Sequence, residues 1–265
     1  STGFGSSITL TQTSGTLTTT TVYVKLANNA TTASGGSISL TSTGAGTVTL
    51  AVTVNTDNSL DFDGVNDRVS LPVSVINGLT NFTFEAWVNP STYSSNQRIF
   101  DGGIDVNKYL LFTINNGKPF FAISNGTYPQ VQTTSTIPLN TWTHLAIVLN
   151  NTTHIATIYV NGQVAASASM PLNPSGIGTF LNANLGISTI YPGENFKGKM
   201  DEVRFWSTAR SASEITNNYL TELVGNETGL VAYYNMNQGT ANASNAGLTS
   251  LLDKTATPKN GTLNN

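Results

Sequence analysis

The chain has 265 residues, of which 38% are hydrophobic and 9% are charged, and its formal net charge is −3. Typical soluble domains carry roughly 25% charged residues, so a surface rich in Ser, Thr, Asn and Gly replaces them, as is common in proteins that face the outside of the cell. The 11 Lys and Arg residues are scattered singly, which argues against nucleic-acid binding. The absence of cysteine excludes disulfides, thiolate metal sites and cysteine nucleophiles.

No stretch of the sequence approaches the ~18 apolar residues that a membrane span requires, so we expect no membrane insertion. The first residues also lack the charged and apolar regions of a signal peptide. If the protein is exported, we therefore expect this chain to be the mature form or a piece of something longer.

Residues 1–56 form a Thr/Ser-rich block in which apolar and polar residues alternate, as in half-buried strands. The alternating stretches lie at 8–11, 22–26, 38–41 and 48–54. Four or five short strands are few for a closed sandwich, which needs about seven. We therefore interpret 1–56 as the end of an immunoglobulin-like spacer, or as a small spacer of its own. The composition shifts near Asn55–Ser59, which predicts a second domain over 57–265.

Strand patterns joined by tight turns continue through the second domain. Asn-Gly pairs at Asn116-Gly117 and Asn161-Gly162 separate strand-like runs and predict β-hairpins, because both residues tolerate positive φ. One helix is predicted over Ser211–Leu223, where Ser211 and Glu214 have the spacing of a capping box and Leu220 falls on the packing face. The sequence predicts an all-β fold, with one short helix and a small N-terminal β-sandwich-like segment.

The second domain carries five signatures in a fixed order. They are SLDFDGVNDRVSLP at 59–72, NFTFEAWVNP at 81–90, TWTHLAIV at 141–148, ATIYVNG at 156–162, and a closing pair, FKGKMDEVRFW at 196–206 with GLVAYYNM at 229–236. This series resembles the laminin-G-like or pentraxin-like jelly roll of the concanavalin-A-like lectin/glucanase superfamily. The resemblance implies an antiparallel jelly-roll β-sandwich. The N-terminal block resembles, more weakly, immunoglobulin-like spacers of bacterial surface proteins.

Catalysis is not expected from the carboxylates of the sequence. Glycosidases with this fold commonly carry a Glu-x-Asp-x-x-Glu strand, and no Glu residue here lies in that pattern. Asp201 and Glu202 are neighbours and should point to opposite faces of a strand. A Ser-His-Asp triad with His144 or His154 is left open by the sequence, although no Gly-x-Ser-x-Gly motif is present. We predict that the chain is not an enzyme.

The family resemblance implies a structural calcium ion. Members of the family often hold calcium between the opening turn and the closing Gly-x-Met-Asp-Glu, and the matching positions are Asp63, Asp67 and Asp201. Calcium takes six to eight oxygen ligands, which carboxylates supply. The alternative is that Asp63 and Asp67 only stabilise a turn by accepting backbone N–H groups. The paired-calcium ligand site of pentraxins, a Glu-Gln-Asp cluster, has no counterpart here.

Aromatic side chains are the third group of candidates, because sugars stack their apolar faces on exposed rings. Trp87, Trp142 and Trp206 lie in strand signatures and are predicted to be core residues. Loops carry most binding residues on rigid scaffolds. The predicted ligand-binding residues in loops are Tyr93, Asp101, Asn125, Tyr128, Tyr191 and Asn195.

The sequence thus predicts an extracellular or cell-surface recognition module whose jelly-roll loops bind a glycan or a partner protein. Two alternatives remain at this point. The chain could be a structural stalk or filament module with no small ligand, or a carbohydrate-binding domain appended to a polysaccharide-degrading enzyme. Open strand edges in 1–56 would also allow pairing with neighbouring copies or domains.

Overall fold

The computed structural model describes residues 36–42, 45–52, 58–240 and 245–265. Its contacts divide the chain into two units, Ser1–Thr56 and Asp57–Asn265. In the first unit, β1 (Gly36–Ser42) and β2 (Ala45–Val52) form an antiparallel hairpin in which Ile38 pairs with Leu50. The strands predicted at 8–11 and 22–26 lie outside the described residues, so the immunoglobulin-like spacer stays a prediction.

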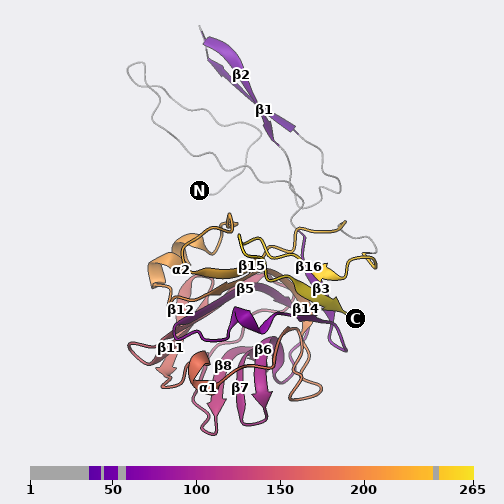
Figure 1. Cartoon of the computed structure of the whole chain (residues 1–265). Coiled ribbons are helices and arrows are strands. Elements are labelled where there is room, and N and C mark those ends of the chain that lie inside the picture. Colours follow the sequence, from indigo (N-terminus) through magenta and orange to yellow (C-terminus); the bar gives the residue numbers. More distant parts are fainter. Residues whose placement is uncertain (1–35, 43–44, 53–57, 241–244) are drawn as a thin grey trace. The chain divides into compact units, whose positions relative to one another are not determined.

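The second unit is an antiparallel β-sandwich of two sheets, as the sequence predicted (Figure 1). In spatial order, the seven-stranded sheet contains β12 (Gln163–Ser169), β11 (Ile155–Val160), β10 (Thr143–Asn150), β5 (Phe82–Pro90), β14 (Lys197–Trp206) and β15 (Leu230–Tyr234), with β3 (Leu60–Asp63) also paired to β14. The eight-stranded sheet contains β16 (Ser250–Leu251), β17 (Gly261–Asn264), β4 (Arg68–Ser70), β13 (Asn182–Leu185), β6 (Gln97–Asp105), β7 (Lys108–Asn115), β8 (Lys118–Asn125) and β9 (Gln130–Gln132).

Three short helical segments accompany the sheets. They are the 3₁₀ turn η1 (Val73–Val75), α1 (Pro174–Ile177) and α2 (Ala212–Asn218). None of the helices in the described ranges has the length and hydropathy needed to cross a membrane.

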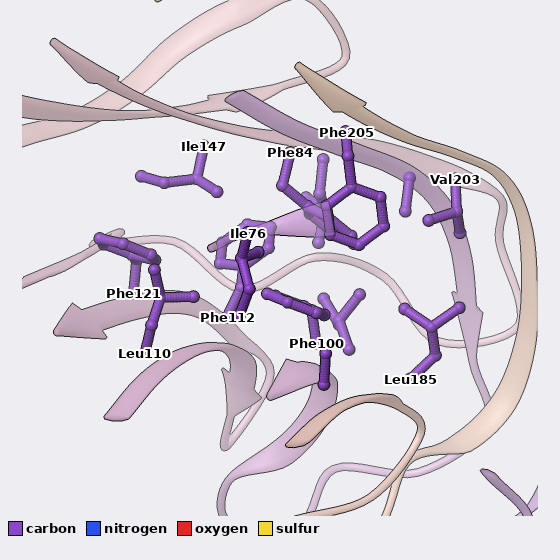
Figure 2. Packing of buried hydrophobic residues seen from close by; sticks show 14 of the residues in the cluster. Ile76, Phe84, Phe100, Leu110, Phe112, Phe121, Ile147, Leu185, Val203 and Phe205 are labelled. Carbon is purple, nitrogen blue, oxygen red and sulfur yellow. The ribbon is translucent and has the colours of Figure 1, made fainter. Parts of the chain in front are cut away.

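The main core lies between the two sheets, where the alternating residues of each strand meet. On β5, Phe82, Phe84, Ala86 and Val88 all point inward and are fully buried. The Phe84 ring stacks on Phe100 of the facing sheet, with 5.3 Å between centroids. Figure 2 shows side chains of the two sheets pointing toward each other around these rings. Full burial of one such side chain contributes about 1.5–3 kcal/mol, so the alternation of the sequence fixes which face is inside.

The two Asn-Gly hairpins are confirmed. Asn116 and Gly117 have φ values of 49° and 82°, and Asn161 and Gly162 have 49° and 77°. Positive φ at both central residues is the geometry that matches the twist of the flanking strands, which explains why Asn-Gly occurs at these positions.

Helix α2 begins as predicted but ends earlier. Ser211 and Glu214 form the reciprocal capping box, and Ile215 is buried against the outer face of the seven-stranded sheet. The helix stops at Asn218, and Leu220 is 73% exposed, so its predicted packing role is wrong. The bond from Thr221 N to Asn218 O tightens the last turn, and Asn is a poor residue for continuing a helix.

The prediction of three core tryptophans is correct for one of them. Trp206 is buried at 2% exposure, Trp87 is half-buried, and Trp142 is 38% exposed. Trp142 lies just before the first residue of β10, so the alternation of the strand does not direct its ring into the core.

Candidate functional site

The outer face of the eight-stranded sheet carries a second apolar cluster. On β7, Leu110 and Phe112 enter the main core, while Tyr109 and Leu111 point the other way. Phe120 and Ala122 of β8 join them, and Ile190 and Tyr191 of a long loop pack on top. These strands are apolar on both sides because both faces are covered.

Three tyrosines gather on this face, and we call Tyr109, Tyr128 and Tyr191 the tyrosine cluster. The Tyr109 centroid lies 5.6 Å from that of Tyr191, edge to face, and 6.0 Å from that of Tyr128. Tyr109 is 8% exposed, whereas Tyr128 is 46% exposed. Burial raises the pKa of Tyr109, and a hydrogen bond with Tyr191 raises it further, so its hydroxyl stays protonated at physiological pH.

Arg98 lies beneath the tyrosine cluster and is 2% exposed. Its guanidinium carbon is 5.8 Å from the Tyr191 centroid, within the range of a cation–π interaction. Its Nε is 3.3 Å from Asp101 Oδ2, and a terminal nitrogen donates to Glu194. Asn96 also donates to Glu194 at 2.8 Å, which fixes the carboxylate at the edge of the cluster.

A β-bulge brings Arg98 and Asp101 together. Residues three apart on a regular strand point to opposite faces. The pairing of β6 with β7 shifts register between Arg98 and Phe100, so Arg98 and Asp101 both pair with outward residues of β7. Bulges re-aim side chains in this way.

Asp101 and Asn184 form the floor of this surface, adjacent across the β6–β13 pairing. Burial raises the pKa of Asp101 to about 6, against the opposing effect of Arg98. Asp101 Oδ1 and Asn184 Nδ2 are buried and have no hydrogen-bond partner among the described residues. A buried polar atom without a partner costs about 1–3 kcal/mol, so this floor holds two polar atoms whose hydrogen-bonding capacity is unused.

The structure brings together three of the six predicted ligand-binding residues, Asp101, Tyr128 and Tyr191. The other three lie elsewhere. The Tyr93 hydroxyl donates to Ile137 O at 2.6 Å, and Asn125 Nδ2 donates to Gly176 O at 3.1 Å. Asn195 Nδ2 donates to Val65 O at 2.6 Å and so ties its loop to the opening turn.

Sequence reasoning missed Arg98, Tyr109 and Glu194. Arg98 and Glu194 are 96 positions apart, and no local pattern connects them. A signal for Tyr109 was present: residues 109–114 are apolar on both alternating positions apart from Thr113, which indicates a strand with both faces covered.

The predicted calcium ligands of the opening turn act as turn acceptors. Asp63 Oδ1 accepts Val65 N at 2.7 Å, and Asp67 Oδ2 accepts Asp63 N at 2.8 Å. The Val65 hydrogen bond is the main cause that lowers the pKa of Asp63. Both side chains line an open groove of about 680 Å³ with Lys197 and Asn140.

Asp201 does not join this turn. Asp63 pairs with Lys197 on β14, and Asp201 lies four residues further along that strand, opposite Trp87. At about 3.3 Å per residue, the separation along the strand is about 13 Å. In the described ranges, no group of three His, Asp or Glu side chains is arranged to hold a metal ion. The three residues named for calcium therefore do not fit one common site.

The expectation for Asp201 and Glu202 is also corrected. A bulge lies between Asp201 and Arg204, and Glu202 has a φ of 52°. As a result, Asp201 and Glu202 face the same, outer side of the sheet. Glu202 contacts Arg204 and Tyr233 there, and Asp201 lies opposite Trp87.

The candidate base His144 is part of a buried ionic cluster under α2. His144 Nε2 is 3.3 Å from Glu85 Oε2, and both side chains are at most 1% exposed. Arg210 Nε lies 3.6 Å from Glu85 and the guanidinium covers the Trp206 ring at 3.9 Å. His154 is exposed in a turn with a φ of 55°. The two histidines therefore occupy different environments.

Solved structures share this fold. A candidate carbohydrate-binding protein from Bacteroides ovatus matches at 22% identity with a TM-score of 0.62, over 85% of this chain and 63% of its own. The chain thus spans less than two thirds of that relative. The CBM40 domain of the Ruminococcus gnavus IT-sialidase, bound to α2,3-sialyllactose, matches at 13% identity with a TM-score of 0.52, over 60% of this chain and 95% of its own.

Domain 4 of an extracellular GH43 arabinanase from Geobacillus stearothermophilus, in complex with arabinotriose, matches at 20% identity with a TM-score of 0.53, over 69% of this chain and 81% of its own. No curated protein is detectably similar in sequence. A laminin G family model, described as the concanavalin A-like lectin/glucanases superfamily, matches residues 62–216. That match covers more than half of the chain and agrees with its two-sheet architecture. The chain belongs to the concanavalin A-like lectin/glucanases superfamily.

Proposed function

We propose that this chain is a non-catalytic module that binds glycans on the outer face of the eight-stranded sheet, over the tyrosine cluster. The observation that carries the proposal is the exposed Tyr128 ring, held against Tyr109 and Phe120 above a buried arginine. A tyrosine ring offers an apolar face to the C–H groups of a sugar and a hydroxyl to its polar groups.

Polar side chains surround the ring on the same face. Gln130 and Gln132 of β9 pair with Ala122 and Phe120, so they share the outer face, and both are exposed. Amide groups donate and accept at once, as sugar hydroxyls do. The rigid sheet fixes these groups in advance, which lowers the entropic cost of binding.

The fold relatives support the same reading. Two of them are a CBM40 domain bound to sialyllactose and an arabinanase domain bound to arabinotriose. Because both are domains of larger enzymes, an appended carbohydrate-binding domain is the form of the proposal that they favour. An extracellular or cell-surface location belongs to this proposal, and a surface protein is the alternative partner to a glycan.

Two further predictions from the sequence stay predictions. Structural calcium is one, and its named ligands Asp63, Asp67 and Asp201 do not converge. Pairing with neighbouring copies through open strand edges of 1–56 is the other.

A glycan array with three proteins tests the proposal: the natural chain, Tyr128→Ala and Tyr93→Ala. Tyr93 is the matched control, because it is also 46% exposed but bonds to Ile137 away from the tyrosine cluster. We expect glycan binding by the natural chain and by Tyr93→Ala, and a loss of about tenfold or more in Tyr128→Ala, since covering a large apolar side chain contributes about 1.5–3 kcal/mol. Binding that survives Tyr128→Ala unchanged would place the ligand elsewhere.

A further inference from the structure

The charges around the tyrosine cluster bear on which glycans it can take. Among the described residues, Arg98 and Glu194 act on the tyrosines through their charges, and Asp101 contacts Arg98. Arg98 carries the positive charge, and carboxylates contact it on two sides. One cation flanked by two carboxylates leaves this surface without a spare positive charge.

The guanidinium is also less accessible than the carboxylate of Glu194. Arg98 is 2% exposed, whereas Glu194 is 22% exposed at the rim. A ligand that approaches Tyr128 therefore meets the Glu194 carboxylate before it meets the guanidinium. Both charges act on Tyr128: burial is the main cause that raises the pKa of its hydroxyl, the charge of Arg98 lowers this pKa, and the charge of Glu194 raises it.

Resting on the proposed glycan site, we infer that the tyrosine cluster selects neutral sugars and rejects sugars that carry a carboxylate. An acidic sugar would have to displace Glu194 from Arg98 and Asn96 to gain a cation. If Glu194 stayed in place, the carboxylate of the sugar would lie near the Glu194 carboxylate, and no positive charge would offset their repulsion. Sugar hydroxyl groups have neither cost, and they can donate to the Glu194 carboxylate at the rim.

The inferred preference for neutral sugars distinguishes this chain from one of its fold relatives. The CBM40 domain of the R. gnavus sialidase is bound to sialyllactose, which carries a carboxylate. Shared architecture therefore does not determine the charge of the ligand, and the side chains on the outer face do.

Matched glycan pairs test the inference on the full 265-residue chain. Each pair differs only in whether its carboxylates are esterified or free: the methyl ester of sialyllactose with sialyllactose, and methyl-esterified with free oligogalacturonates. We expect binders among the neutral members, each losing affinity in Tyr128→Ala. Their acidic counterparts should bind about tenfold more weakly, as expected for one unit charge about 6 Å from another at intermediate dielectric.

Two further readouts separate charge from shape. Raising the salt concentration from 20 to 500 mM should change the affinity for the neutral ligand by less than about twofold, because no charge on the ligand is screened. Glu194→Gln should raise the affinity for the acidic members relative to that for their neutral partners, because Arg98 then loses one of its two carboxylates.

The outcomes are distinguishable. Acidic members that bind more tightly than their neutral partners, with the Tyr128→Ala loss intact, overturn the inference and leave the proposed function standing. The absence of any Tyr128-dependent glycan overturns the proposed function, and the inference falls with it.

Discussion

The guanidinium carbon of Arg98 lies 5.8 Å from the centre of the Tyr191 ring, although the two residues are 93 positions apart in the chain. Arg98 comes from β6 and Tyr191 from the loop between β13 and β14. The contact fixes that loop over the outer face of the sheet, together with the bond from the Tyr191 hydroxyl to Val106 O at 3.0 Å. The tyrosine cluster therefore depends on a buried charge for its shape.

Removing the charge of Arg98 should destabilise the fold. In Arg98→Met, Asp101 would remain buried at 1% exposure with its cation gone. Breaking a buried ion pair from one side costs about 3–5 kcal/mol, and we expect a loss of this size in urea unfolding at pH 7. The double variant Arg98→Met/Asp101→Asn should recover most of it. An equal loss in the single and double variants would mean that the ion pair is not the cause.

Asp101 should make stability depend on pH in a defined window. Burial raises its pKa in the folded chain from the ordinary 3.8 to about 6, so the folded state holds a proton between these values that the unfolded state has released. The contribution of this group to stability is present below about pH 4, falls as the pH rises to about 6, and is constant above that.

Comparison with Asp101→Asn isolates the effect, because all other groups titrate in both proteins. The shift of about two units corresponds to about 3 kcal/mol. We expect the difference in unfolding free energy to move in favour of Asp101→Asn by up to that amount between pH 4 and pH 7. A difference that is flat with pH would show that Asp101 titrates normally.

His144 should remain neutral below its ordinary pKa of 6.5. Burial lowers the pKa of His144, and this effect exceeds the opposing hydrogen bond and charge of Glu85, with Arg204 and Arg210 adding to the decrease. Because the unfolded chain takes up this proton first, His144 contributes stability above pH 6.5 that is lost as the pH falls toward the lowered pKa.

Histidine ring signals in an NMR titration measure this directly. The chain has two histidines, so His154→Gln assigns the remaining signal to His144. We expect its midpoint below pH 6.5. A midpoint above 6.5 would mean that the Glu85 interaction exceeds the cost of burial.

Calcium should not raise the melting temperature through the residues that the family resemblance named. Asp63 and Asp67 already accept backbone N–H groups, and Asp201 lies on another part of β14. A rise in melting temperature that scales with calcium concentration would show a native-state site. We expect any such rise to be equal in the natural chain, Asp63→Asn and Asp201→Asn, and a rise that is lost in either variant would identify that carboxylate as a ligand.

Local sequence patterns predicted the hairpin turns and the helix start correctly, because a few residue types there determine the backbone conformation. Asn-Gly pairs favour positive φ, as found at Gly117 and Gly162, and the Ser211–Glu214 spacing is typical of a helix start. Each feature could therefore be predicted from a few adjacent residues. The same rules failed where register changes. The bulges after Arg98 and after Asp201 each turn a side chain to the face opposite to the one that alternation predicts.

The sequence by itself determined the all-β fold, because strand alternation and turn residues act over a few positions and burying the apolar face is worth more than any local alternative. It also predicted half of the candidate site, Asp101, Tyr128 and Tyr191, as loop residues, which is wrong for Asp101 because it lies within β6 and is 1% exposed. Only the tertiary structure decided that these three meet, and that Arg98, Tyr109 and Glu194 join them. The physical reason is that the cluster is built by strand pairing and by a bulge, which place side chains nearly a hundred residues apart in contact.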